Sequence, residues 1–177
     1  MTFEVSSIPR GRQLREAFPL IGVCAQDYTW QSTVDFEPIP GMAVLLEPHC
    51  AYAITAYLSY SSDTAADLWV RLDRPTLSAG QWGINGLPSA ATGSVGSGTA
   101  DTAQWLQEGT FSGVPDSYRL AGIGTSTPAV ARLSGFCATA SYGGALQLVG
   151  AQYVSTASVT TLHALSWLEV VKIDERS

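Results

Sequence analysis

Side chains of two kinds alternate along residues 51–62 (AYAITAYLSYSS). One set is Tyr52, Ile54, Ala56, Leu58 and Tyr60, and the other is Ala53, Thr55, Tyr57 and Ser59. Because successive side chains of a strand point to opposite faces, this alternation predicts a strand with one buried face. Residues 66–72 (ADLWVRL) alternate again after a polar turn at residues 61–64, so we expect these two segments to form a hairpin.

Strand-like segments bounded by turn residues continue along the chain, and no helical pattern is longer than two turns. Residues 35–40 contain two prolines and are expected to be an edge or a connection, and residues 125–128 a turn. The further candidate strands are residues 21–30, 42–47, 80–87, 102–111, 118–124 and 130–140. Eight to ten short antiparallel strands at this spacing predict an all-β sandwich or barrel.

The chain closes with two apolar runs inside residues 143–173, ALQLVGAQYV and TLHALSWLEVVKI. The short turn STASVT lies between them. Two apolar runs around a turn of small polar residues are typical of neighbouring antiparallel strands. We therefore expect the two runs to pair with each other.

The charge content is low for a globular protein. Charged residues make up 14% of the chain and hydrophobic residues 46%, with a net charge of −6, whereas globular proteins average about 25% charged residues. Wide neutral surfaces, or surfaces covered by other subunits, would account for this composition. The negative net charge argues against nucleic acid as a partner.

Three cysteines, Cys24, Cys50 and Cys137, are widely spaced and odd in number. A disulfide framework would require an even and dense set, so we expect reduced, buried thiols, as in a protein made in a reducing cytoplasm. The start of the chain lacks the pattern of a signal peptide, and the apolar run at residues 42–46 is too short to span a membrane.

Residues 1–20 differ from the rest of the chain because three of its nine basic residues, Arg10, Arg12 and Arg15, lie there. One interpretation is a solvated tail. The other is a docking arm that becomes ordered on a partner with acidic groups. In the second case the arm would bury Phe3, Ile8, Leu14 and Phe18 and pair its arginines with the partner's carboxylates. Residues 21–177 would then form the β-sandwich domain.

No motif for catalysis, a metal or a cofactor is found. His49 and Cys50 would point to opposite sides of a strand, and His163 is expected to face a partner or solvent. The sequence has no G-x-S-x-G nucleophile motif, and its acidic residues are scattered over turns. The glycines within residues 88–99 lack the spacing and the lysine of a phosphate-binding loop. We therefore expect no enzyme activity, no metal and no cofactor.

Five tryptophans could either fill a sandwich core or subunit interface, or stack on sugar rings. Trp82 and Trp105 lie next to loops and are the candidates for exposed aromatics that contact a ligand or partner. The remaining tryptophans are expected in a core or interface.

The closing segment resembles the last strands of a jelly-roll domain found in structural proteins of tailed bacteriophages, especially those that infect actinobacteria. The matching positions are Leu146-Gln-Leu148, Ala151-Gln152, Thr156 to Thr161, Ser166-Trp-Leu168 and Ile173, with Ala51 to Tyr60, Ala65 to Arg71 and Gly86-Leu-Pro88 upstream. Two positions depart from the family pattern: Leu165 replaces a glycine, and Val149-Gly150 replaces an aromatic residue. At these two positions the detailed side-chain packing of the family is therefore not carried over to this chain.

The resemblance implies an eight-stranded jelly roll of the complement or tumour-necrosis-factor type, usually trimeric and without catalytic activity. It implies a virion component: a capsid decoration (minor capsid or head-fibre) protein on the capsid exterior, or a minor tail protein. The partners would be two further copies and the major capsid protein or tail proteins, with no nucleic acid and no membrane. Residues expected in the core or the trimer interface are Tyr52, Ile54, Leu58, Leu68, Val70, Leu146, Leu148, Trp167 and Leu168.

Three other functions stay open at this point. A minor tail or receptor-binding protein would recognise host surface glycans through exposed aromatics at one end of the sandwich. An enzyme acting on cell-wall polymer would need converging carboxylates in a cleft. A cellular binding module unrelated to phages would also fit the composition.

Overall fold

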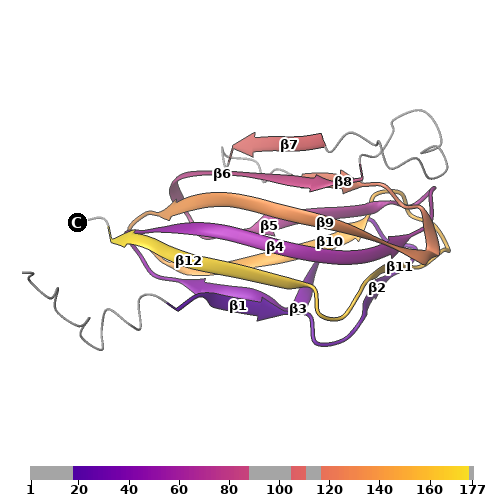
Figure 1. Cartoon of the computed structure of the whole chain (residues 1–177), viewed down its shortest axis with the longest axis horizontal. Helices are drawn as coiled ribbons and strands as arrows, with labels where there is room; N and C mark the ends of the chain where they lie inside the picture. Colours follow the sequence, from indigo (N-terminus) through magenta and orange to yellow (C-terminus); the bar gives the residue numbers. More distant parts are fainter. Residues whose placement is uncertain (1–17, 88–104, 111–116, 176–177) are drawn as a thin grey trace, which may run out of the picture.

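Strands make up nearly all of the fold. The computed structural model describes residues 18–87, 105–110 and 117–175, and within these residues it contains twelve strands and no helix (Figure 1). The strands are β1 (Leu20–Val23), β2 (Tyr28–Trp30), β3 (Glu37–Leu46), β4 (Cys50–Ser62), β5 (Leu68–Asp73), β6 (Leu77–Gly86), β7 (Trp105–Thr110), β8 (Ser117–Leu120), β9 (Gly124–Thr139), β10 (Gly144–Gln152), β11 (Thr160–Leu162) and β12 (Trp167–Glu175).

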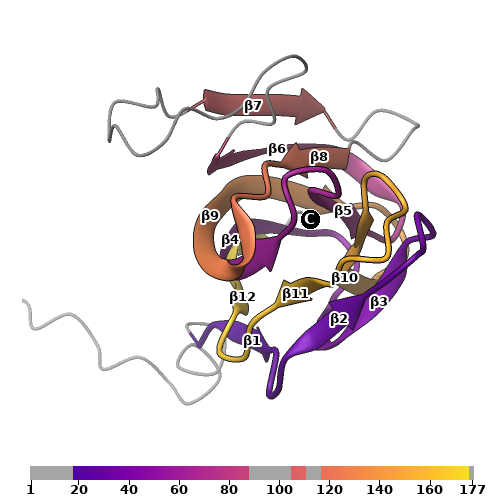
Figure 2. The same ribbon diagram turned by 90° about the vertical axis from the view of Figure 1, so that its right-hand side faces the viewer.

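The strands form two antiparallel sheets that face each other. The eight-stranded sheet has the order β1-β12-β4-β9-β6-β7, with β11 paired to β4 and β2 paired to β11. The four-stranded sheet has the order β3-β10-β5-β8. In the end view of Figure 2, β4, β9 and β12 lie on the left and β3 and β10 on the right, so the core lies between them. This arrangement confirms the predicted all-β sandwich.

The sheet order is that of a jelly roll. Without the short β2 and β11 and the β6–β7 pair, eight strands remain, and they can be numbered from one to eight along the chain. In that numbering one sheet has the order 1-8-3-6 and the other 2-7-4-5. All successive strands in this numbering except the fourth and fifth therefore cross between the sheets, as in two nested Greek keys. The count exceeds the predicted eight to ten because β6–β7 extends one sheet and β2–β11 forms an additional short pair.

Two predicted strand pairings are wrong. β4 and β5 do not form a hairpin, because β4 pairs with β9, β11 and β12 whereas β5 pairs with β8 and β10. The two closing runs do not pair either, because β10 lies between β3 and β5 whereas β12 lies between β1 and β4. In both cases the connection crosses from one sheet to the other. Alternation identifies the buried face of a strand but carries no information about its neighbour.

Several predicted boundaries also change. The candidate strand at residues 21–30 is divided into β1 and β2, and the turn predicted at residues 125–128 lies inside β9. The proline-containing segment at residues 35–40 largely belongs to β3. Prolines are tolerated there because β3 is an edge strand, and the register shift between Gln147 and Val149 of β10 lies opposite this segment.

Two glycines allow the edge strands β1 and β3 to approach each other. A Cβ atom on Gly22 would lie 2.7 Å from the carbonyl oxygen of Gly41, and Gly41 itself has a φ of 79°. Because only glycine adopts this backbone without strain, the close contact of the two sheets at this edge depends on these two positions.

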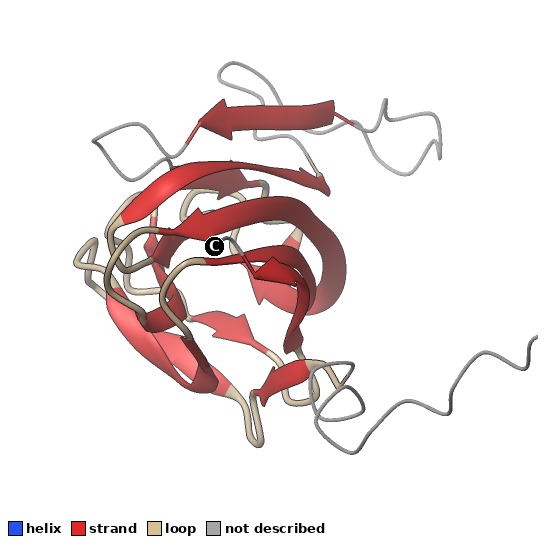
Figure 3. Ribbon diagram, turned by 90° about the vertical axis from the view of Figure 1, so that its left-hand side faces the viewer, coloured by secondary structure: helices blue, strands red, loops and turns tan. Residues whose placement is uncertain are grey.

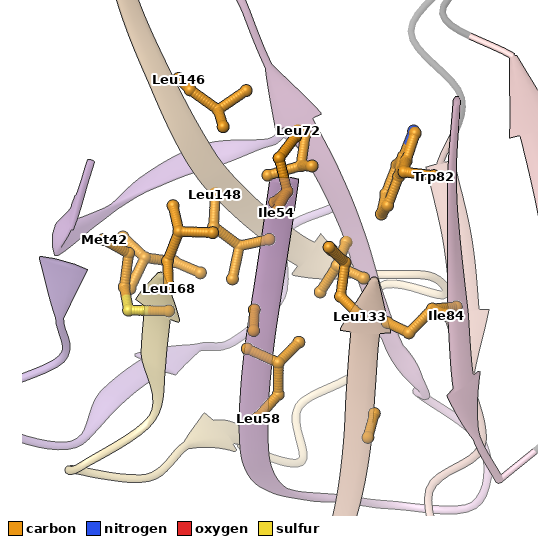
Figure 4. Close-up of a cluster of buried hydrophobic side chains, with 14 of the residues drawn as sticks. Met42, Ile54, Leu58, Leu72, Trp82, Ile84, Leu133, Leu146, Leu148 and Leu168 are labelled. Atoms are coloured by element: carbon orange, nitrogen blue, oxygen red, sulfur yellow. The ribbon is translucent and has the colours of Figure 1, made fainter. Parts of the chain in front are cut away.

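The core contains eight of the nine residues expected in the core or the trimer interface. Tyr52, Ile54, Leu58, Leu68, Val70, Leu146, Leu148 and Leu168 are all buried. Figure 4 shows the side chains from both sheets packed together. The ninth residue, Trp167, is half-buried and lies on the opposite face of β12.

The three cysteines are buried free thiols, as expected. Burial raises the pKa of the Cys137 thiol to about 11, which keeps it protonated at neutral pH. Burial is also the main cause of the raised pKa of Cys24. Structural packing is therefore the role that the geometry supports for these residues.

One departure from the family pattern leads to a stability prediction. Leu165, which stands where the resembled phage pattern has a glycine, has a φ of 67°, although its side chain is 76% exposed. A non-glycine residue in this conformation costs about 1 kcal/mol. Leu165→Gly should therefore raise the free energy of unfolding by about 0.5–1 kcal/mol. Urea denaturation provides the measurement.

Leu45→Gly is the matched control, because Leu45 is comparably exposed but lies within β3 and has no positive φ. Glycine weakens a regular strand, so this control should lower the stability by about 0.5–1 kcal/mol. The same sign of change at both positions would contradict the argument.

Candidate functional site

The outer face of the four-stranded sheet is covered by its own side chains. The ring of Trp69 lies 4.5 Å from that of Phe36 and 5.4 Å from that of Tyr153, between ring centroids. The guanidinium of Arg71 lies 4.3 Å above the Phe36 ring, and that of Arg119 lies 4.1 Å above the Tyr153 ring. These stacked groups shield the small residues of β10 beneath them, so this face is already packed.

Both arginines on the outer face of the four-stranded sheet, Arg71 and Arg119, also have carboxylate partners. Arg71 donates to Asp73 at 2.7 Å, and Arg119 donates to Asp67 at 2.6 Å. The positive charges are therefore neutralised within the chain. This leaves little capacity on this face for an additional charged ligand.

The outer face of the eight-stranded sheet is different. Its outward side carries exposed apolar side chains among polar ones such as Thr55 and Ser134, whereas a solvated sheet face is normally polar. Figure 3 shows that no helix lies over this face in the described part of the chain. The exposed apolar side chains, with exposed fractions from 39% to 58%, are Ile21, Val23, Tyr57, Val130 and Phe136. We call this set the apolar face.

One row of side chains crosses the apolar face from strand to strand. The register places Val23 of β1 opposite Trp167 of β12, Trp167 opposite Tyr57 of β4, and Tyr57 opposite Arg132 of β9. Arg132 in turn lies opposite Asn85 of β6. The row thus combines two aromatic rings, one guanidinium and one amide on neighbouring strands.

An open pocket lies over this row. Its volume is about 900 Å³, and its lining includes Tyr57, Asn85, Val130, Arg132 and Trp167. Aromatic faces and a few hydrogen-bonding groups in a concave site are typical of ligand or partner contacts. It is the strongest candidate for a functional site in the described part of the chain.

Two charged groups belong to the apolar face. Arg132 is exposed on β9, and Glu169 is half-buried on β12, with β4 between the two strands. Among the residues that the structure describes, no carboxylate pairs with Arg132 and no cation pairs with Glu169. Each therefore faces outward with its charge uncompensated.

The expectation that Trp82 is an exposed contact residue is wrong. Trp82 is 1% exposed and lies with the buried core side chains (Figure 4). Its ring packs edge-on against Tyr118, with 4.6 Å between the ring centroids. Burial is possible because Gly135 lies directly opposite on β9, where a Cβ atom would be 2.6 Å from the Cβ of Trp82. The proximity of Trp82 to a loop in sequence was therefore a poor guide to its exposure.

Other predicted contact residues are placed only in part. Phe18 is 70% exposed and immediately precedes β1. The remaining predicted contacts lie outside the part of the chain that the structure describes. They are the arm residues Phe3, Ile8, Arg10, Arg12, Leu14 and Arg15, the side chain of Trp105 and the loop at residues 88–99.

The main residues of the pocket were not predicted from the sequence as contact residues. Tyr57 belongs to the outward set of the first alternating segment, and Val130 and Arg132 alternate with buried residues of β9. An apolar or aromatic residue in the outward set of two neighbouring strands is the signal that could have found them. Using it would have required knowing that β4 and β9 are neighbours.

His163 faces an aspartate rather than a partner or open solvent. Its Nδ1 lies 3.5 Å from one carboxylate oxygen of Asp27, and the other carboxylate oxygen accepts a 2.8 Å hydrogen bond from the Ala164 N–H. That backbone hydrogen bond is the main reason that the pKa of Asp27 is lowered. No group of three or more metal-ligating side chains occurs within the described ranges.

Comparisons with known proteins add little. No protein-family model matches the sequence, and no curated protein matches it. Among solved structures, chains in the structures of the Gx and Gt strains of infectious bursal disease virus show 12% identity, with TM-scores of 0.22 and 0.23. The alignments cover 88% and 90% of this chain but 42% and 43% of theirs. Likenesses this weak carry no argument about fold or function.

No helix in the described part of the chain is long and apolar enough to cross a membrane.

Proposed function

We propose that this chain is a non-enzymatic structural protein of a virion and that it acts as a homotrimer. The observation that carries the proposal is the apolar face, an outward sheet surface with apolar side chains exposed on β1, β4 and β9. Soluble monomers rarely leave such a surface uncovered. The jelly-roll sheet order and the similarity of residues 44–173 to phage structural proteins support the same interpretation.

The most specific form of the proposal is a capsid decoration (minor capsid or head-fibre) protein of a tailed bacteriophage. Residues 1–20 act as the docking arm on the capsid exterior, with Arg10, Arg12 and Arg15 placed against acidic groups of the major capsid protein. Three arms per trimer raise the apparent affinity through effective concentration, without any new type of contact.

Binding to particles of the virus that encodes the chain tests this form. The full-length protein should co-sediment with the particles, and deletion of residues 1–19 should reduce binding at least tenfold, because the arm supplies the contacts. The shortened protein must keep the oligomeric mass of the full-length protein. Unchanged binding after the deletion would contradict the arm, and no binding of the full-length protein would contradict the virion role.

The pocket favours one alternative, a minor tail or receptor-binding protein that recognises host surface glycans. Tyr57 and Trp167 could stack on sugar rings, and Arg132 and Asn85 could donate hydrogen bonds. A glycan array is the test: binding that Tyr57→Ala abolishes would support this alternative, and an array without hits would argue against it.

A further inference from the structure

We propose that copies of this chain meet through the apolar face, with Arg132 of one copy paired to Glu169 of the next. This inference rests on the self-association in the proposed function and specifies its surface. Nothing in the strand arrangement alone requires it. It follows from the apolar character of the face and from its two uncompensated charges.

The extent of the apolar face is the first argument. It reaches from Ile21 on the edge strand β1 to Phe136 on β9, across β12 and β4, and neither residue belongs to the pocket lining. A small ligand in the pocket would leave both of them exposed. A flat and broad protein surface would cover the whole area, as at the apolar centre of a subunit interface.

Charge complementarity is the second argument, and it selects a copy of the same chain as the occupant. On the described side chains of β1, β12, β4, β9 and β6, the outward face carries one positive and one negative group, Arg132 and Glu169. Lys172 of β12 pairs with Glu47 instead. Because Arg132 and Glu169 lie on either side of β4, the Arg132 side of one copy can meet the Glu169 side of the next. Such a head-to-tail contact closes into a ring when a threefold axis repeats it.

The chemistry of the row is the third argument, because it fits a sugar less well. Arg132 and the Trp167 N–H can only donate hydrogen bonds, and the acceptors of the row are the Asn85 carbonyl and the Tyr57 hydroxyl, whereas each hydroxyl group of a sugar both donates and accepts. A guanidinium beside Tyr57, with Trp167 one strand further on, is instead suited to a carboxylate partner close to aromatic rings. Glu169 of a neighbouring copy supplies such a carboxylate.

Charge reversal tests the inference on the full-length chain. Arg132→Glu and Glu169→Arg should each weaken self-association at least tenfold, because like charges would then meet at an apolar interface. The double variant Arg132→Glu/Glu169→Arg restores the pair with its signs exchanged and should return the dissociation constant to within about threefold of the original. Light scattering over a concentration series gives these constants.

Asp35→Arg is the matched control. Asp35 is exposed between β2 and β3, away from the apolar face, and its replacement changes the net charge by the same amount as Glu169→Arg. It should leave the dissociation constant unchanged. Thermal unfolding of each variant shows whether the monomer fold is retained.

The outcomes distinguish this inference from the proposed function. Loss in both single variants with recovery in the double variant supports the pairing. If the unmodified protein associates but neither single variant weakens it, the interface lies elsewhere and the inference is overturned. If the double variant does not recover the original dissociation constant, the Arg132–Glu169 pair is likewise overturned. A monomeric unmodified protein contradicts the proposed self-association itself, before any variant is compared.

Discussion

Replacing Asp67 with alanine should lower the free energy of unfolding by about 3 kcal/mol. The Asp67 side chain is 4% exposed, and its two carboxylate oxygens accept hydrogen bonds from Arg119 at 2.6 Å and from the Gly122 N–H at 2.7 Å. The variant leaves a buried backbone donor without its partner and removes the counter-charge of a guanidinium. Breaking a buried ion pair costs about 3–5 kcal/mol, and the partial exposure of Arg119 places the estimate at the lower end.

The location of Asp67 explains why the effect should be large. It ends the connection by which the chain crosses from β4 to β5, and Gly122 lies in the connection between β8 and β9. The backbone carbonyl of Asp67 also accepts a hydrogen bond from the Tyr153 N–H, just after β10. One residue therefore joins three connections of the jelly roll. Its φ of 54° adds to the cost, because aspartate tolerates this conformation better than alanine.

Asp73→Ala is the matched control for this prediction. Asp73 forms the same type of pair with Arg71, but its side chain is 44% exposed. Exposed pairs contribute about 0–1 kcal/mol, so the control should change stability by no more than that. Urea denaturation of both variants gives the comparison, and equal losses at the two positions would contradict the proposed role of Asp67.

The second large effect is expected for Gly150→Ala, which should destabilise the protein by about 2–3 kcal/mol. An added Cβ atom at Gly150 would lie 2.6 Å from Cζ2 of Trp30. Trp30 is 1% exposed, so its ring cannot move out into solvent to make room. Overpacking in a dense core typically costs about 1–3 kcal/mol, which outweighs the entropy gained by replacing glycine.

A double-mutant cycle separates this clash from a general effect of the substitution. Trp30→Phe alone should cost about 1–3 kcal/mol because it leaves a cavity. In the Trp30→Phe background the smaller ring leaves room for the new methyl group, so the loss caused by Gly150→Ala should fall by at least about 1 kcal/mol. Additive losses in the double variant would show that the contact with Trp30 is not the cause.

The strand content and the buried faces could be predicted from the sequence, because both depend on local alternation. The pattern around Ile54 and Leu58 identified the inward side of β4 correctly. The neighbours of each strand could not be predicted in this way, since every connection of a jelly roll can cross between sheets. The hairpin expected of β4 and β5 failed for this reason.

The candidate site depended on the same missing information. Trp82 is buried because Gly135, far away in sequence, lies opposite it. Tyr57 and Arg132 form part of one surface only because β4 and β9 are neighbours. The glycine at position 150 is likewise explained by a distant residue, because Trp30 of β2 packs against it. Long-range register therefore determined both the exposed and the buried aromatic residues.

The mass of the purified full-length protein in solution tests the central claim most directly. If the chain is the proposed homotrimer, with the apolar face covered by other copies, light scattering at micromolar concentration should give three times the 18.7 kDa mass of the chain. A mass equal to a single chain at every concentration would contradict the claim and leave the apolar face available to a different kind of partner.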